Sequence, residues 1–379
     1  MSSYGGIAGN QIYSYADEKN ATIVDLRSDT LSRPSLAMRQ AMFNAEVGDD
    51  VYEEDPTVVE LQDKAAALLG KEAALFVVSG TMGNLIAIMN HCNERGSEAY
   101  CGEESHTFLH EQGGAAQLAG VMLCTLPNNA DGTFDLKTLK NRLRSDRLHE
   151  PISRLVLIEN TFNGKILPQS WIDEVSIFAK ENNLKLHMDG ARIWNAAIGS
   201  GIPAKEIVRG CDSVTFCLSK GLGAPAGSLL CGSRSFVEKA RRIRKVLGGG
   251  MRQVGVLAAA GLIALEQGVQ LLKEDHRRAF LIGETINSLG SKTFSVNLKT
   301  TATNMVMVNI NSEDITAQNF VDRLEWVIDD VQDDRTIVRS LAINSRLVRF
   351  VFYYEIDDEA VERAGRKICH VIGKLDATV

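Results

Sequence analysis

The stretch that decides the fold reads DSVTFCLSKGLGAPAGSLLCG and runs from Asp212 to Gly232. Two short β-branched and apolar runs, 213–218 and 227–231, flank a loop rich in Gly, Pro and Ala that begins at Ser219. This pattern predicts a strand, a turn and a returning strand, with Lys220 where the first strand ends. A lysine held there among apolar residues loses hydration of its ammonium, which favours the nucleophilic amine. A solvated loop lysine is the alternative, and Lys220 alone does not decide between them.

A second stretch upstream reads LKLHMDGARIW and covers residues 184–194. Apolar residues alternate with Lys185 and His187, which predicts a strand that ends at Asp189. An acid just past a buried strand, with Arg192 three residues on, suits a ring that carries a cationic nitrogen and a phenolate oxygen. Pyridoxal phosphate presents both groups, and its protonated pyridine is an electron sink. A structural turn pair is the alternative for these two residues, but the lysine at the next strand end favours the cofactor.

The remaining motifs are DLRSDT (25–30), GDDVYEEDPTV (48–58), SGTMGN (79–84), ESHTFLHEQGG (104–114), ENTFNGKILP (159–168), HMDGARIWNA (187–196), CLSKGLGAPAGSLL (217–230) and GGGMRQVG (248–255). With the two stretches above, they resemble the threonine aldolases of fold type I. The resemblance extends from about Asp25 to the C-terminus. It implies a pyridoxal phosphate enzyme that acts on a small amino acid.

The resemblance also implies how the cofactor is held. Lys220 matches the Schiff-base lysine, Asp189 the acid that keeps the pyridine nitrogen protonated, and Arg192 the contact to the ring hydroxyl oxygen. The phosphate is assigned to Gly80, Thr81 and Arg252. No metal site is expected. From the residues alone, SGTMGN is a small-residue loop between a strand and a helix, which can bind phosphate through backbone N–H groups.

Further residues are implied for the substrate. The residue at His106 stacks on the cofactor ring and takes part in catalysis, and His110, four positions on, is expected near the substrate. Arg349 in LVRFVF fits a carboxylate-binding arginine, because a guanidinium pairs with a carboxylate through two hydrogen bonds. Ser28 assists it. Tyr52 resembles a tyrosine donated by a neighbouring subunit, so a dimer or tetramer with shared sites is expected.

One position departs from the family pattern. Low-specificity threonine aldolases commonly carry histidine in the block that reads ENTFNGKILP here, where this chain has Phe162. That histidine is thought to help bind or deprotonate the β-hydroxyl of the substrate. Phenylalanine cannot accept a proton. Cleavage then requires that His106, His110 or a water takes over.

Three functions remain open on this reasoning. The first is retro-aldol cleavage of L-threonine or L-allo-threonine to glycine and acetaldehyde by a lyase. The second is an alanine or serine racemase that breaks the Cα–H bond on the same cofactor, which Phe162 favours. The third is a non-catalytic protein on the same fold, against which the intact Lys220, Asp189 and Arg192 argue.

Bulk composition excludes several other classes. The chain has 379 residues, 45% hydrophobic and 23% charged, and a formal net charge of -7, which argues against binding nucleic acid or an anionic membrane. The N-terminal segment has neither an apolar core nor an arginine-rich amphipathic pattern. The seven cysteines form no CxxC motif and suit a reducing compartment. A soluble cytoplasmic enzyme is expected.

Alternation of strand and helix patterns over the central residues predicts an α/β fold. The expected architecture is that of fold type I enzymes: a large domain with a mostly parallel, seven-stranded sheet, followed by a smaller α+β domain. The predicted borders give an N-terminal arm (1–34), the cofactor-binding domain (35–258) and the C-terminal domain (259–379). Because ligands gather at the carboxyl ends of parallel strands, we expect Gly80, His106, Asn160, Asp189 and Lys220 to converge.

Overall fold

The computed structural model describes residues 21–145, 147–327 and 335–378. These residues form two compact units, which we call the large unit (32–270) and the small unit (21–31 with 271–378). Of the predicted N-terminal arm, residues 1–20 lie outside the described residues. The unit borders fall after residues 31 and 270. The domain borders predicted from the sequence, after residues 34 and 258, stay a prediction.

The large unit is built on a seven-stranded sheet. Its strands, in spatial order, are β2 (Ala73–Val77), β8 (Ser228–Gly232), β7 (Ser213–Cys217), β6 (Lys185–Asp189), β5 (Ile152–Glu159), β3 (Ser97–Gly102) and β4 (Met122–Leu126). β8 runs antiparallel to both of its neighbours, and the other adjacent pairs are parallel. The predicted returning strand is therefore present, and the predicted sheet is confirmed.

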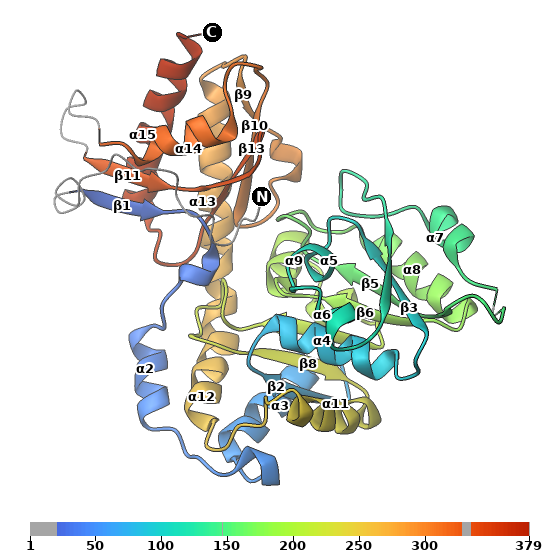
Figure 1. Cartoon of the computed structure of the whole chain (residues 1–379). Helices are drawn as coiled ribbons and strands as arrows, with labels where there is room; N and C mark the ends of the chain where they lie inside the picture. The colour runs from blue at the N-terminus through green and yellow to red at the C-terminus, as the bar shows by residue number, and fades with distance from the viewer. Residues whose placement is uncertain (1–20, 146, 328–334, 379) are drawn as a thin grey trace. The chain divides into compact units, whose positions relative to one another are not determined.

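Helices cover the faces of this sheet. The helical segments of the large unit are α2 (Leu36–Phe43), the 3-10 turn η2 (Asp50–Tyr52), α3 (Pro56–Leu68), α4 (Gly80–His91), α5 (His106–Leu109), α6 (Gly114–Gln117), α7 (Leu136–Arg142), α8 (Gln169–Glu181), α9 (Ile193–Ser200), α10 (Ala204–Ile207), α11 (Arg234–Val246), α12 (Gly255–Ile263) and the π-helical turn η3 (Ala264–Gly268). Figure 1 shows α4 and α11 against β8 and β2, where their apolar residues form one core cluster. Coverage on both faces explains why β3, β7 and β8 are buried along their whole length.

The connection from β2 to α4 follows its local sequence closely. β2 ends at Val77, and Ser79 then caps α4 by accepting a hydrogen bond from the backbone N–H of Met82 (3.2 Å). α4 packs on β7, where Gly83 lies against Thr215. A short strand, a capping serine and two glycines thus bring the N-terminus of α4 close to the sheet.

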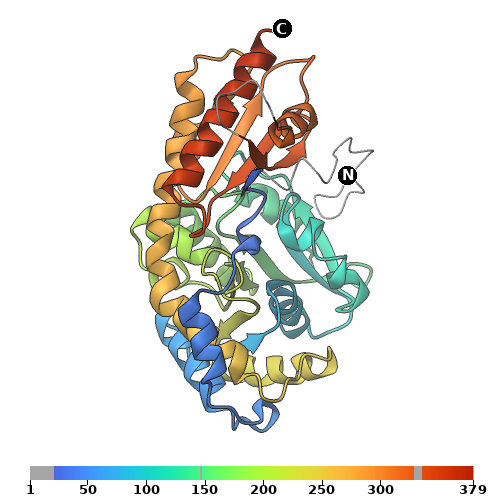
Figure 2. The same cartoon turned by 90° about the vertical axis from the view of Figure 1, so that its left-hand side faces the viewer.

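The small unit has its own sheet and core. The antiparallel sheet has the order β12 (Leu341–Asn344), β13 (Leu347–Val351), β10 (Met305–Ile310) and β9 (Phe294–Val296), and β1 (Thr22–Asp25) pairs in parallel with β11 (Thr336–Arg339). Helices α13 (Val269–Ser288), α14 (Ala317–Glu325) and α15 (Asp358–Asp376) pack on these strands, with α13 and α15 side by side in Figure 2. Two short 3-10 turns, η1 (Asp29–Leu31) and η4 (Leu298–Thr300), complete the unit. β13 ends at Val351, and a turn follows it.

One continuous helical stretch, Gly255–Ser288, is long and apolar enough by composition to span a membrane. Half of its most apolar window is buried inside the protein. Its first part, α12, packs against α2 and α3. This burial is typical of a core helix, so the stretch is weak evidence for a membrane span.

The close packing of α4 on β7 predicts that Gly83 tolerates no side chain. A Cβ at Gly83 would lie 2.6 Å from Thr215 Cγ2, so Gly83→Ala forces backbone or side-chain shifts. We expect a loss of about 1–3 kcal/mol in the free energy of unfolding, measured by urea denaturation. Gly373→Ala in α15 is the control, since a Cβ there meets nothing within 4 Å. That variant should be as stable as the parent or more so, and a Gly83→Ala protein of unchanged stability would contradict the packing.

Candidate active site

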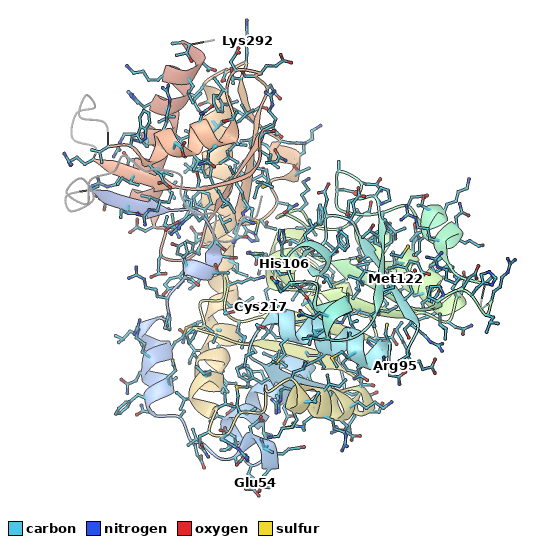
Figure 3. All side chains as sticks on the ribbon, in the orientation of Figure 1. Glu54, Arg95, His106, Met122, Cys217 and Lys292 are labelled. Carbon is cyan, nitrogen blue, oxygen red and sulfur yellow. The ribbon has the colours of Figure 1, made fainter. Side chains whose placement is uncertain are left out.

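The carboxyl ends of the parallel strands bring the predicted polar residues to one edge. Glu159 and Asp189 are the last residues of β5 and β6 and lie directly opposite each other in the sheet register. His106 follows β3 and Lys220 follows β7; Figure 3 labels His106 and also Cys217, the last residue of β7. The charges of Asp189 and Lys220 act on both His106 and Glu159. The predicted convergence at this edge of the sheet is therefore present.

Asp189 is buried and held on both carboxylate oxygens. Its Oδ2 accepts a hydrogen bond from Asn84 Nδ2 (2.8 Å), and its Oδ1 accepts one from the backbone N–H of Ala191 (3.0 Å). The backbone N–H of Asn160 donates to the carbonyl of Asp189 (2.9 Å). The acid is thus fixed in one orientation before any ligand binds.

His106 is paired with a second buried acid, Glu111. The two are joined by a hydrogen bond between His106 Nδ1 and Glu111 Oε1 (3.0 Å). Burial lowers the pKa of His106, but the hydrogen bond to Glu111 and the charges of Asp189 and Glu111 outweigh it, so the pKa is raised. Burial raises the pKa of the Glu111 carboxyl. His106 therefore holds its proton more strongly than a free histidine.

Glu159 is the third acid of this group. Burial first, and the charge of Asp189 second, raise the pKa of the Glu159 carboxyl. Its Oε2 accepts a hydrogen bond from the backbone N–H of His106 (2.8 Å). Glu159 thereby anchors the start of α5, on which His106 lies.

A chain of hydrogen bonds continues behind Asp189 into the core. Asn84 Oδ1 lies 3.1 Å from His187 Nε2, His187 Nδ1 lies 2.8 Å from Ser213 Oγ, and this hydroxyl lies 2.7 Å from His91 Nε2. Burial lowers the pKa of His187 to about 3 and that of His91 to about 4. Both imidazoles are therefore neutral at neutral pH.

The ligand atoms of His106, Glu111 and Asp189 lie within 4.8 Å of one another, a spacing that a metal ion can bridge. In this structure the Asn84 amide donates to both carboxylates at 2.8 Å. An amide donor in that place favours an organic hydrogen-bonded site over metal coordination.

The other end of the candidate site is the N-terminus of α4. Gly80 and Thr81 are its first two residues, so their backbone N–H groups belong to the unpaired first turn. A Cβ at Gly80 would lie 2.9 Å from Cys217 Sγ, which explains why glycine stands at this point. Unpaired N–H groups and the helix dipole are the features that bind a phosphate.

Two predicted residues lie away from this group. Tyr52 is 70% exposed in η2, and Arg252 Nη1 pairs with Asp49 Oδ2 (2.8 Å) on the surface. Asp50, between Asp49 and Tyr52 in this loop, forms a buried ion pair with Arg244 (2.5 Å). The loop that carries Tyr52 is therefore firmly anchored, while the roles predicted for Tyr52 and Arg252 stay predictions.

Ser28 and Arg349 belong to the small unit. Arg349 lies on β13, and its Nη2 donates to the backbone carbonyl of Arg27 (3.1 Å), the residue before Ser28. The two residues predicted to bind the substrate carboxylate are thus neighbours within this unit. Arg346, a second arginine close by in the sequence, is exposed at the turn before β13.

Phe162 is a core residue of the large unit, 4% exposed. Its backbone pairs with Lys165, and its side chain fills the space beside Gly132, where a Cβ would lie 2.6 Å away. His110, by contrast, is exposed, and its ring centroid lies 5.5 Å from that of His106. Of these three residues, only the two histidines can exchange a proton.

Sequence reasoning missed the residues that support Asp189. His187 served only as a polar member of the alternation that predicted its strand, and the structure shows it fully buried. A strand covered on both faces buries both sets of side chains, and this rule is the signal that was available. Asn84 and Glu111 stand inside quoted motifs, SGTMGN and ESHTFLHEQGG, but no spacing rule marks them as partners.

A mostly parallel seven-stranded sheet with a buried acid, an arginine and a lysine at its carboxyl edge is the arrangement of fold type I pyridoxal phosphate enzymes. Comparison with known proteins identifies the family. The model of the beta-eliminating lyase family matches residues 25–312, and the chain belongs to this family.

Its relatives within the family are threonine aldolases. The chain is 49% identical over 292 residues to the probable low-specificity L-threonine aldolase 2 of Arabidopsis thaliana, covering 76% of this chain and 82% of the relative. It is 48% identical over 295 residues to the low specificity L-threonine aldolase of Escherichia coli K12, covering 78% and 87%. A solved structure of a putative L-allo-threonine aldolase from Listeria monocytogenes shares the fold, with a TM-score of 0.75, 22% identity and coverage of 94% and 98%.

The His106–Glu111 pair makes a prediction about titration. Since the pKa of folded His106 is raised above 6.5, its protonation stabilises the fold below pH 6.5, and this contribution is lost as the pH rises through the folded value. Glu111→Gln removes the hydrogen-bonding carboxylate but keeps the shape. We expect the His106 ring to titrate at a lower pH in this variant, measured by NMR of the histidine ring protons. An unchanged titration would contradict the pairing.

Proposed function

We propose that the chain is a pyridoxal phosphate enzyme that cleaves L-threonine and L-allo-threonine to glycine and acetaldehyde. The observation that carries the proposal is the convergence of Asp189, His106 and Lys220 at the carboxyl edge of the sheet. The match to two low-specificity L-threonine aldolases at 48% and 49% identity supports the same activity. The relatives do not favour the racemase alternative.

The residues present fit the cofactor. Asp189 offers a buried carboxylate to a cationic ring nitrogen, Arg192 follows at the start of α9, and the first turn of α4 offers N–H groups to a phosphate. Asn160 Nδ2 is buried and has no hydrogen-bond partner among the described residues. A buried donor without a partner is costly, and a ligand acceptor would satisfy it.

The proposed holding set is Lys220 for covalent attachment, Asp189 for the ring nitrogen, Arg192 for the ring hydroxyl oxygen, and Gly80, Thr81 and Arg252 for the phosphate. When bound, pyridoxal phosphate supplies an electron sink for the carbanion that bond cleavage leaves. His106, held by Glu111 and by the backbone anchor at Glu159, presents its ring to the same site.

Arg349 and Ser28 are proposed to bind the substrate carboxylate. A guanidinium pairs with a carboxylate in a fixed, two-point geometry, so it orients the substrate as well as binding it. The hydrogen bond from Arg349 to the carbonyl of Arg27 limits the freedom of the guanidinium in the small unit. Reduced freedom lowers the entropic cost of substrate binding.

The proton of the substrate hydroxyl is proposed to go to His110. Phe162 cannot accept it, and the Nδ1 atom of His106 is already hydrogen-bonded to Glu111 Oε1 (3.0 Å). His110 is exposed and lies next to His106, with ring centroids 5.5 Å apart. The chain then retains a base although the family's usual histidine is replaced by Phe162.

A homo-oligomer with shared sites is proposed for the assembly. Several large apolar side chains of the large unit are exposed: Leu36 (82%), Phe43 (86%), Val246 (76%) and Tyr52 (70%). Such exposed apolar side chains are candidates for burial in a subunit contact. A second subunit would bury these groups and bring Tyr52 to a neighbouring site. A cytoplasmic location is proposed with it, in keeping with the seven free cysteines.

The activity is tested by incubating the purified protein, loaded with pyridoxal phosphate, with L-threonine, L-allo-threonine, L-serine and L-alanine. We expect acetaldehyde and glycine from the first two. Lys220→Ala should abolish cofactor attachment and cleavage together, while Lys185→Ala, on the exposed side of β6, should retain both. D-alanine formed from L-alanine, with no acetaldehyde from threonine, would overturn the proposal in favour of a racemase.

The assignment of the base has its own test. His110→Phe should lower kcat for threonine cleavage about a hundredfold or more, because positioned general bases contribute that much. His149→Phe, an exposed histidine of a distant loop, is the matched control and should leave kcat unchanged. Full activity of His110→Phe would assign the proton to another group.

A further inference from the structure

The buried amide of Asn84 lies at the centre of the polar network, and none of the roles proposed above uses it. Asn84 is 1% exposed and lies in α4, four residues after Gly80. Its Nδ2 donates to Asp189 Oδ2 and to Glu111 Oε1, both at 2.8 Å. A primary amide has two N–H groups, so each carboxylate receives one.

The orientation of the Asn84 amide is set by its contact with His187, on the side away from the two carboxylates. Asn84 Oδ1 lies 3.1 Å from His187 Nε2, so the carbonyl needs a proton on that ring nitrogen. The opposite orientation would place the amide oxygen against two carboxylates and the amide N–H groups against an imidazole. An amide oxygen that faces the buried carboxyl groups is repelled by their oxygens, which disfavours that orientation.

The proton on His187 Nε2 fixes the rest of the network. A neutral imidazole with Nε2–H accepts at Nδ1, so Ser213 Oγ must donate to it across 2.8 Å. The Ser213 hydroxyl has a single proton, which it donates to His187. In the 2.7 Å contact between Ser213 Oγ and His91 Nε2, the histidine must therefore be the donor. His91 in turn stacks on Phe236 with ring centroids 4.7 Å apart. Each hydrogen bond of this network is therefore donated in the direction that leads from His91 to Asp189 and Glu111.

We propose that Asn84 is a positioning residue, which aligns the carboxylates of Asp189 and Glu111 and is itself aligned by His187. Asp189 faces the cofactor ring in the proposed function, and Glu111 holds His106. The amide therefore couples the acid that supports the cofactor with the histidine beside it. The inference rests on the proposed function for the identity of the cofactor, but not for the hydrogen-bond directions.

The first test uses the full chain without cofactor. Nitrogen-15 NMR of histidine-labelled protein reports which ring nitrogen carries the proton, and His187→Gln assigns the signal. We expect neutral His187 with its proton on Nε2. A proton on Nδ1 would require the reversed amide and would overturn the inference, whether or not the protein proves to be an aldolase.

The second test measures cofactor affinity. Asn84→Asp keeps the side-chain shape but replaces both donors with a third carboxylate. We expect the dissociation constant for pyridoxal phosphate, measured by absorbance titration, to rise about ten- to a hundredfold, the usual effect of leaving a buried partner unpaired. Asn90→Asp is the matched control in the same helix, since Asn90 donates to the carbonyl of Phe236 and, among the described residues, contacts neither Asp189 nor Glu111. That variant should bind like the parent.

The third test separates positioning from simple packing. In the double variant Asn84→Asp with Glu111→Gln, the new amide at position 111 restores a donor to the carboxylate at position 84, across the contact that Asn84 and Glu111 make in the parent. We expect it to bind the cofactor more tightly than Asn84→Asp alone. Purely additive losses, or an Asn84→Asp protein that binds as the parent does, would overturn the coupling. A parent protein that binds no pyridoxal phosphate would instead overturn the proposed function.

Discussion

Three carboxyl groups, those of Asp189, Glu111 and Glu159, are gathered at one edge of the sheet. The large unit supplies the hydrogen bonds that these buried groups need. Removing a carboxylate from water is costly unless hydrogen bonds or opposite charges replace the solvent. Here the replacements are the Asn84 amide and backbone N–H groups. The charges of His106 and Lys220 add to them. The site thus keeps buried carboxyl groups in fixed positions, which suits a cofactor with a cationic ring.

Helix α4 links this electrostatic requirement to the fold. Its first residues can lie beside β7 because Gly80 and Gly83 have no Cβ, for which the structure leaves no room. The first turn of α4 offers free N–H groups to a phosphate. Asn84 follows in the next turn, and its amide reaches the carboxylates. One helix therefore serves both ends of the proposed cofactor, and its packing on the sheet sets the distance between them. The neutral pair His187 and His91 completes the support from the core side.

The sequence predicted most of this architecture, because strand and helix periods are strong signals in buried α/β sheets. The two strands expected on either side of the Lys220 loop and the strand expected to end at Asp189 are present, and the residues that follow strands converge as expected. The pairing of β1 with β11 was missed, since nothing in the sequence of two short, distant strands indicates that they pair with each other. Glu111 and Asn84 were missed for a related reason: hydrogen-bond partners 27 residues apart are brought together only by tertiary structure. Tyr52 depends on a neighbouring subunit in the family pattern, which a single chain does not contain.

The central claim is that a pyridoxal phosphate ring is attached to Lys220 and supported by Asp189. The most direct measurement is peptide mapping by mass spectrometry after the protein has been incubated with the cofactor and reduced with borohydride. The account predicts that the peptide containing Lys220 carries the reduced pyridoxyl phosphate group and that other lysines do not. An unmodified Lys220, or attachment at a different lysine, would contradict it.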